Sequence, residues 1–240
     1  MLEVLKLTKS FGGLIALRNV EFTIDKGSLV GLIGPNGAGK TTLFNCITGV
    51  YRPSSGKIKF EGKDITGLKP HQICKLGIAR TYQLVKPFSG MTVLENVKVG
   101  AAFGCETGSS QEPIDCLKLV GLGHKKDVLA ANLTLPEKKM LEIARALATN
   151  PKLLLLDEVA AGLNPVEAEK IMHTIKKIRD EMGITIIWIE HVMNVIMRAA
   201  ERVIVLHHGE KIADAPPEEI IRNERVVKAY LGEAYSHIGR

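Results

Sequence analysis

A glycine-rich segment near the start of the chain could bind phosphate groups. It fits the pattern G-x-x-x-x-G-K-[ST] and comprises Gly34, Pro35, Asn36, Gly37, Ala38, Gly39, Lys40, Thr41 and Thr42. An apolar run precedes this segment and helix-forming residues follow it, so backbone amides and a helix N-terminus can surround a β-phosphate. We expect Lys40 to reach the β- and γ-phosphates of a nucleotide and the Thr41 hydroxyl to bind Mg²⁺.

A second candidate site lies where another apolar run, 153–156, ends in Asp157 and Glu158. Ligands of open α/β sheets bind at the carboxyl ends of the strands, which is where these two acids stand. We expect Asp157 to hold the magnesium ion and Glu158 to polarise the attacking water as a general base. Acidic residues also end strands as solvated caps, but the phosphate-binding segment favours the catalytic interpretation.

Two kinds of apolar pattern indicate the elements that would position these residues. Apolar and polar residues alternate over 5–7 and 20–24, and 57–60 form a further strand before a turn, which is typical of half-buried strands. Continuous apolar runs indicate strands covered on both faces of a parallel sheet. These runs are 29–33, 153–156, 184–189 and 203–206. Because helical segments separate them, the sequence predicts an α/β fold with a mostly parallel sheet.

One helix is predicted with both of its ends. Asn164 can cap its N-terminus, Pro165 suits its first turn, and Gly183 can end it. Between them, apolar residues recur at steps of three and four positions and form one stripe. We expect a single domain, 1–240, with a nucleotide-binding core and N-terminal antiparallel β-subdomain (1–84 and 150–212), an inserted helical subdomain (85–149) and a C-terminal tail with a short helix (213–240).

Composition argues against several classes of protein. With 45% hydrophobic residues and no apolar stretch near the ~20 residues that span a bilayer, the chain reads as globular, and any membrane association must come through a partner. No secretory signal is visible at its start. The four cysteines, Cys46, Cys74, Cys105 and Cys116, form no C-x-x-C pair, so we expect reduced thiols rather than disulfides or zinc. The net charge of +6 is interspersed with acids, which indicates solvated helix faces rather than a nucleic-acid surface.

Taken together, these motifs resemble the ATPase subunit of an ABC transporter, and the resemblance covers nearly the whole chain. It implies a P-loop NTPase core, ATP and Mg²⁺ as ligands, and hydrolysis coupled to transmembrane transport. It also implies a D-loop, here 161–164, and a switch histidine that senses the γ-phosphate, here His191 after the strand at 184–189. A lone histidine is usually structural, so only the other motifs single out His191.

The same resemblance assigns roles to two further residues. Gln83 matches the glutamine that reaches Mg²⁺ and the attacking water and couples to the membrane subunit. A solvated loop amide is the alternative for Gln83. Phe11 stands where the family stacks an aromatic ring on adenine, although it could instead pack within the β-subdomain.

Some longer strings resemble the ATPases of branched-chain amino-acid importers; these are 10–17, 77–83, 91–97 and 230–233. This resemblance implies a second ABC ATPase in a homodimer or heterodimer, transmembrane permease subunits and, indirectly, an extracytoplasmic substrate-binding protein. It also implies a peripheral location on the cytoplasmic face of the cell membrane. Relatives that serve urea or short amides, and the lipopolysaccharide-export ATPase, share several of these strings. The cargo therefore stays open, since an ATPase subunit does not touch it.

The chain departs from the family where the signature loop L-S-x-G-Q should stand. It carries Leu133, Thr134, Leu135, Pro136 and Glu137 instead. Pro136 replaces a glycine and has no N–H to give to a phosphate, yet Thr134 and Glu137 fit a capping box at the start of a helix. Val159 and Asn164 also differ from the family's usual proline and aspartate. These departures affect the part of an ATP site that the signature loop would supply, and they leave the phosphate-binding segment unchanged.

Two other function classes remain as alternatives. A soluble ABC ATPase acting on nucleic acid or the ribosome would usually carry a long coiled-coil insertion or a second cassette. A P-loop phosphotransferase should carry a lid for an acceptor substrate. The sequence has neither insertion nor second cassette, and the signature-like loop and His191 argue against the phosphotransferase.

Overall fold

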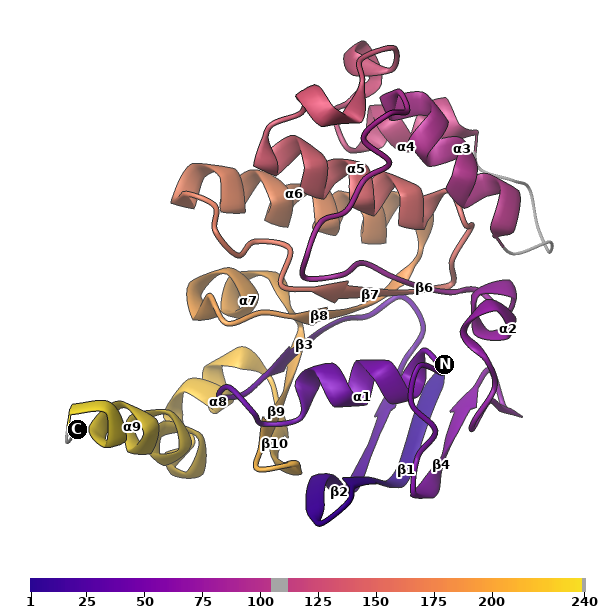
Figure 1. Ribbon diagram of the computed structural model, residues 1–240. Helices are drawn as coiled ribbons and strands as arrows, with labels where there is room; N and C mark the ends of the chain where they lie inside the picture. Colours follow the sequence, from indigo (N-terminus) through magenta and orange to yellow (C-terminus); the bar gives the residue numbers. More distant parts are fainter. Residues whose placement is uncertain (105–111, 239–240) are drawn as a thin grey trace. The chain divides into compact units, whose positions relative to one another are not determined.

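The computed structural model describes residues 1–104 and 112–238 and divides the chain into two compact units. The first unit comprises Met1–Pro70 and Ile187–Arg240, and the second comprises His71–Ile186. Figure 1 shows the helices and strands of both units. The boundaries expected for the helical subdomain and the tail stay predictions.

The first unit contains a four-stranded antiparallel sheet in the order β2-β1-β4-β5. Its strands are β1 (Leu2–Phe11), β2 (Leu14–Ile24), β4 (Ser55–Phe60) and β5 (Lys63–Asp64). The central strand β1 places Leu2 opposite Ile24 on one side and opposite Phe60 on the other. Buried and accessible side chains alternate along these strands, because one face covers the core. The antiparallel β-subdomain expected from the alternating pattern is therefore present.

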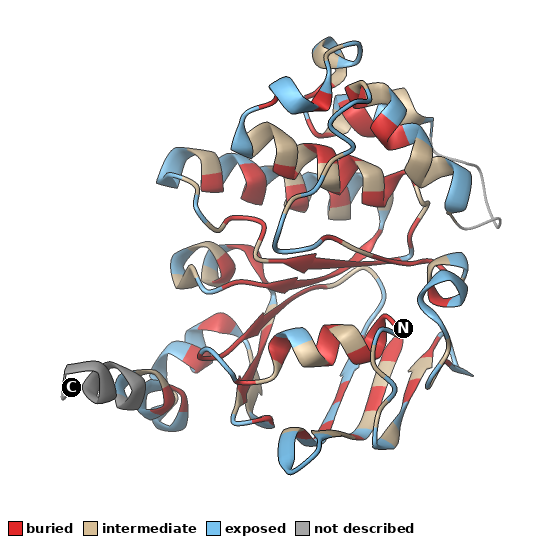
Figure 2. Cartoon of the chain, viewed as in Figure 1, coloured by how far each residue is buried: buried red, intermediate tan, exposed pale blue. Residues whose placement is uncertain are grey.

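A second group of strands in the first unit runs in the order β10-β9-β3. Strand β3 (Leu29–Ile33) is parallel to β9 (Arg202–His207), which pairs with β10 (Glu210–Ala215) in an antiparallel hairpin. Every residue of β3 is buried, as the continuous apolar run predicts (Figure 2). Helices α1 (Lys40–Ile47) and α7 (Met193–Ala199) also belong to this unit.

The C-terminal part of the chain differs from the expectation of one short helix. The strand β10 was not expected, because its half-exposed residues include only one large apolar side chain, Ile212. Two helices follow it, α8 (Pro217–Arg222) and α9 (Glu224–Ile238). A half-exposed edge strand gives too weak an apolar pattern for recognition from sequence.

The second unit joins two parallel strands to a group of helices. Strands β6 (Ile78–Arg80) and β7 (Leu153–Asp157) pair with Ile78 opposite Leu153, and all of β7 is buried. Helices α3 (Val93–Phe103), α4 (Pro113–Leu119) and α5 (Leu135–Leu147) pack against one another (Figure 1). The remaining elements are α2 (Pro70–Lys75), the short helices η1 (Gly123–Lys125) and η2 (Ala130–Asn132), and α6 (Pro165–Met182). Strand β8 (Thr185–Ile189) carries the chain out of this unit.

The predicted ends of α6 are confirmed. The Asn164 side chain accepts a hydrogen bond from the Glu167 amide, and the Glu167 side chain accepts one from the Asn164 amide. Gly183 ends the helix in the left-handed conformation, with φ of 63°. Within the described residues, every helix is too short or too polar to cross a bilayer. Cys46, Cys74 and Cys116 are free thiols, and Cys105 lies outside the described residues.

The β9–β10 hairpin is held by an ion pair that also reaches β2. The Arg202 guanidinium donates to both carboxylate oxygens of Asp214, at 2.6 and 2.8 Å, and to the Thr23 carbonyl at 2.9 Å. Lys211 adds a third hydrogen bond to Asp214 at 2.9 Å. Burial raises the pKa of the Asp214 carboxyl, but the hydrogen bonds from Arg202 and Lys211 outweigh it and hold this pKa below its usual value.

The Asp214→Asn variant should lose about 1–3 kcal/mol of unfolding free energy at pH 7, because it leaves Arg202 without an ionised partner. Since the folded pKa of Asp214 is lowered, its contribution is present above the unfolded pKa of about 4 and is lost as the pH falls through the folded pKa. Urea unfolding at several pH values should therefore show the two proteins converging in acid. Asp115→Asn, at an exposed pair with Lys118, is the matched control and should change stability little. A pH-independent difference at Asp214 would contradict the ionic explanation.

Candidate active site

The glycine-rich segment of the first unit forms a tight loop between β3 and α1. Gly34 has φ of 150°, and a Cβ atom there would lie 2.1 Å from the Leu206 carbonyl oxygen. Gly39 has φ of 102°, and a Cβ atom there would lie 2.7 Å from the Ala16 carbonyl oxygen. Only glycine fits at these positions, because any side chain would collide with the neighbouring backbone.

Lys40, the first residue of α1, is folded back onto this loop. Its side chain is buried, and its ammonium group donates to the carbonyls of Gly34 at 2.5 Å and Pro35 at 3.0 Å. The first amides of a helix have no acceptor within the helix, so they can donate to an anion beside the lysine. Thr41 is exposed and Thr42 is half-buried at the same helix start. This loop therefore offers a cation, amides and hydroxyl groups to a phosphate.

The turn between β9 and β10 supports the glycine-rich loop through backbone hydrogen bonds within the same unit. The Gly209 amide donates to the Ala38 carbonyl at 3.1 Å, and the Gly209 carbonyl accepts from the Arg18 amide at 2.8 Å. These two bonds connect the loop to β2 through the hairpin. The loop conformation thus depends on backbone contacts that the motif itself does not reveal.

Phe11 is the last residue of β1 and is 41% exposed, so its ring can stack on another ring. It meets the edge of Tyr51 at a centroid distance of 5.1 Å, and the Lys9 ammonium lies 4.7 Å from its centroid. Lys9 also donates to the Arg52 carbonyl at 3.0 Å. Tyr51 and Lys9 therefore fix the orientation of Phe11, and neither was singled out from the sequence.

His191 follows β8 and is exposed in the first unit. The preceding residue, Glu190, is fully buried and accepts a hydrogen bond from the Trp188 indole at 3.2 Å. A buried acid next to the histidine anchors the end of the strand from which His191 projects. The role of His191 toward a γ-phosphate stays a prediction.

In the second unit, Asp157 ends β7 in an ion pair. Its carboxylate accepts a hydrogen bond from Arg80 at 2.7 Å, and the two side chains are only 3% and 5% exposed. Thr81 ties the same strands together: its amide donates to the Leu155 carbonyl at 2.9 Å, and its hydroxyl accepts from the Asp157 amide at 3.1 Å. Arg80 was not predicted as a site residue from the sequence, although it lies within the segment 77–83 that contains Gln83.

Glu158 and Gln83 are brought together in this unit. The Gln83 side-chain amide donates to a carboxylate oxygen of Glu158 at 2.8 Å. Glu158 has φ of 50°, an uncommon left-handed conformation for a residue with a side chain. This backbone turn places consecutive acids in different surroundings: Asp157 is buried against Arg80, whereas Glu158 is half-buried and meets Gln83.

The segment 133–137, which differs from the family's signature loop, contains the start of α5, as the capping-box pattern predicts. Thr134 is the N-cap residue, and its amide donates to Glu137 at 3.0 Å. The second oxygen of Glu137 accepts from Lys125 at 2.5 Å, and this hydrogen bond is the main reason that the Glu137 pKa is lowered. Pro136 occupies the first turn, where its missing N–H is tolerated. The loop thus keeps its helix start while Glu137 takes up one amide that could serve an anion.

The donor atoms suit magnesium better than a transition metal. No cluster of three or more His, Cys, Asp or Glu side chains that could hold a metal ion occurs among the described residues. Magnesium is usually bound through one or two carboxylates together with substrate phosphates and water. Each residue predicted as a ligand carries a hard oxygen: Thr41 a hydroxyl, Asp157 a carboxylate and Gln83 a side-chain amide.

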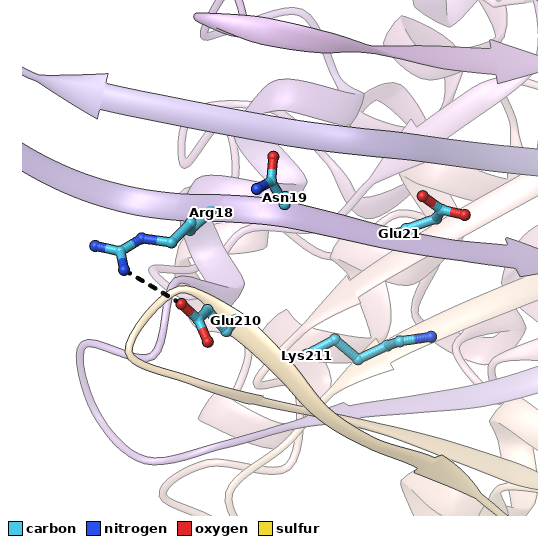
Figure 3. A pocket seen from close by; sticks show the side chains of 5 residues that line it. All are labelled: Arg18, Asn19, Glu21, Glu210 and Lys211. Carbon is cyan, nitrogen blue, oxygen red and sulfur yellow. Dashed lines mark ion pairs between the residues drawn. The ribbon is translucent and has the colours of Figure 1, made fainter.

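A pocket of about 410 Å³ lies elsewhere in the first unit, between β2 and β10 (Figure 3). Charged and polar side chains line it: Arg18, Asn19, Glu21, Glu210 and Lys211. Arg18 and Glu210 approach to 3.5 Å, but both are more than half exposed, so their ion pair contributes little. None of the residues predicted for nucleotide binding lines this pocket.

Comparison with known proteins matches two family models. Residues 17–161 match the model described as "ABC transporter". Residues 210–236 match the model described as "Branched-chain amino acid ATP-binding cassette transporter". The second match covers β10 and most of the two C-terminal helices, where the sequence motifs were weakest.

Individual relatives agree over nearly the whole length. The high-affinity branched-chain amino acid transport ATP-binding protein BraF of Pseudomonas aeruginosa is 40% identical, with 98% of each chain covered. LivG of Escherichia coli, with the same description, is 39% identical at the same coverage.

Solved structures agree as well. A nucleotide-free ATP-binding cassette from an ABC transporter is 33% identical with a TM-score of 0.87, covering 96% of this chain and 98% of that one. The ADP conformation of a similar cassette is 33% identical with a TM-score of 0.88, covering 97% and 98%. The chain therefore belongs to the ABC transporter family and is one of its nucleotide-binding, ATP-hydrolysing cassettes.

Proposed function

We propose that this ATPase powers an ABC importer for branched-chain or other hydrophobic amino acids. The cargo rests on the relatives, whose names describe branched-chain amino acid transport, and on the match of residues 210–236. Uptake of urea or short amides, and lipopolysaccharide export, remain the alternatives for the cargo. The observation that carries the hydrolytic role is the hydrogen bond between Gln83 and Glu158.

ATP binding is assigned to the loop residues from Gly34 to Thr42. Lys40 donates to the β- and γ-phosphates in place of its present carbonyl acceptors, and the backbone amides at the start of α1 donate beside it. The exposed ring of Phe11 stacks on adenine. His191 contacts the γ-phosphate. Thr41, Asp157 and Gln83 hold Mg²⁺, which when bound offsets the negative charge of the phosphates.

Hydrolysis is assigned to Glu158. Its carboxylate polarises a water molecule whose oxygen forms a bond to the γ-phosphorus while the bond to the bridging oxygen breaks, giving ADP and phosphate. Gln83 orients that carboxylate through its 2.8 Å hydrogen bond. Arg80 forms an ion pair with the buried carboxylate of Asp157 and so offers a charged partner to a group removed from water.

The partners proposed are a second ABC ATPase and transmembrane permease subunits, with an extracytoplasmic binding protein acting indirectly. A peripheral position on the cytoplasmic face of the membrane follows from these partners. Exposed apolar side chains in the segment around Gln83 support a permease contact there. They are Tyr82, Leu84, Phe88 and Met91, which are 54%, 72%, 44% and 39% exposed. Exposed apolar groups of this kind often mark interaction sites.

Lys40→Ala should weaken ATP binding by about 10- to 100-fold, because it removes a charged donor to the phosphates. Equilibrium dialysis with labelled ATP measures this directly. Lys57→Ala, at an exposed position of β4, is the control and should bind like the wild type. Wild-type affinity in Lys40→Ala would show that the phosphates bind elsewhere.

Glu158→Gln should bind ATP normally but hydrolyse it at least ~10²-fold more slowly, since the amide keeps the shape of the carboxylate without its basicity. Steady-state release of phosphate and a separate binding assay distinguish the two effects. Glu181→Gln, at an exposed position of α6, should leave both unchanged. Unchanged hydrolysis in Glu158→Gln would assign the general base to another group, with His191 next in line.

The cargo is tested with the same variant in vesicles that contain the complete transporter. Labelled leucine should accumulate with the wild-type ATPase and not with Glu158→Gln. Labelled urea is the competing substrate in a parallel experiment. ATP-dependent uptake of urea without uptake of leucine would refute the amino-acid assignment while leaving the hydrolytic one intact.

The altered signature loop predicts unequal sites in a heterodimer. In this family each ATP joins the phosphate loop of one subunit to the signature loop of the other. Pro136 offers no N–H, and loss of one such donor costs about 10²–10³ in rate. Pro136 therefore weakens the site that contains the partner's phosphate loop, and the site that contains Glu158 should carry most of the hydrolysis. Disabling Glu158 should stop most hydrolysis in the reconstituted pair, whereas the equivalent change in the partner should leave much of it. Equal losses would refute asymmetry. Pro136→Gly should raise the rate at the weaker site.

A further inference from the structure

Helix α5 carries a buried lysine that the proposed mechanism does not use. Lys139 is only 4% exposed. Its ammonium group donates to two backbone carbonyls of the segment after β7, that of Glu158 at 3.2 Å and that of Ala161 at 2.7 Å. A buried cation requires such acceptors, since an ammonium group without them would lose its hydration and gain nothing in exchange. Its acceptors lie at the two ends of the same short turn.

This turn holds Glu158 in its strained conformation. The Ala161 amide donates to the Glu158 carbonyl at 3.1 Å, so 158–161 close a turn that Lys139 bridges from outside. Glu158 has φ of 50°, a left-handed conformation that is unfavourable for a residue with a side chain. The hydrogen bonds of Lys139 offset that cost, because charged donors bind carbonyls more strongly than neutral ones do.

The same helix also holds the residue next to Gln83. Glu142 lies one turn after Lys139 and therefore on the same face of α5. Its carboxylate accepts a hydrogen bond from the Tyr82 amide at 3.0 Å. Burial raises the pKa of Glu142 to about 7, although the Tyr82 amide and the nearby Arg145 and Lys139 favour its ionised form. Adjacent side chains of one helix thus anchor the backbone on each side of the Gln83–Glu158 hydrogen bond.

We propose that Lys139 is a positioning residue for ATP hydrolysis: it locks the left-handed turn at Glu158, while Glu142 fixes the backbone before Gln83. The proposal rests on the catalytic role proposed for Glu158. Lys139 is not among the residues proposed to contact ATP or the attacking water, and it acts through the backbone to which Glu158 is attached. Because α5 begins at the altered signature loop, a displacement of that loop would be transmitted to the turn at Glu158 through Lys139.

The test replaces the ammonium group by an apolar side chain of similar length. In the complete transporter, Lys139→Met should lower kcat by about 10- to 100-fold, because small displacements of a catalytic group have effects of this size. The KM for ATP and the affinity for ATP should stay within about twofold. Lys139→Arg should restore much of kcat, since it can donate to the same carbonyls. Lys138→Met, at a half-buried neighbouring position, is the control and should behave like the wild type.

Two further measurements separate positioning from general damage to the fold. Hydrogen exchange of the peptide containing Ala161 should speed up at least tenfold in Lys139→Met, because the Ala161 amide closes the turn. In a Glu158→Gln background, Lys139→Met should cause no further loss of the residual hydrolysis. Lys139→Gln replaces the Met variant if that protein does not fold, with the same expectations for kcat and exchange.

Each outcome bears on a different statement. A wild-type kcat in Lys139→Met, or further loss of rate in the Glu158→Gln background, would overturn the positioning role of Lys139. Undiminished hydrolysis in Glu158→Gln alone would overturn the proposed catalytic role instead. Unchanged exchange at Ala161 would overturn the turn-locking contact, whichever residue serves as the base.

Discussion

Charged groups removed from water can persist only where other groups satisfy them, and this requirement shapes both units of the protein. Asp157 is buried against Arg80, and Lys40 and Lys139 are buried against backbone carbonyls. An isolated buried charge would cost several kcal/mol, so each of these side chains fixes the backbone or the ion partner around it. The fold thus holds the side chains of Asp157 and Lys139 in place, whereas the proposed function requires Lys40 to exchange its carbonyl acceptors for phosphate oxygens.

The features that could be predicted from sequence are those with a strong local pattern. The continuous apolar runs identified β3 and β7, and the residues Asn164 and Gly183 identified both ends of α6. Lys139 could not be assigned a role in this way, although its spacing to Ile143 and Ala146 places it on the apolar face of α5. A lysine in an apolar stripe signals a buried acceptor, but only the folded chain shows which carbonyls accept.

The ion pair of Arg80 and Asp157 also could not be predicted from the sequence. These residues are far apart in the sequence and meet because β6 and β7 lie side by side in parallel. The apolar run that ends in Asp157 predicted the role of that residue, whereas no pattern in the sequence singled out Arg80. In the same way, β10 has too few apolar residues for recognition, yet its hairpin with β9 supports the phosphate loop through Gly209.

The left-handed conformation of Glu158 has a consequence for how this protein can change over time. Asparagine, aspartate and glycine tolerate such a conformation better than glutamate does, so substitutions that relax the backbone at this position would also alter or remove the proposed catalytic base. Selection for folding alone would therefore favour sequences that hydrolyse ATP poorly. A glutamate at this position costs some folding stability, which its proposed role in hydrolysis would justify.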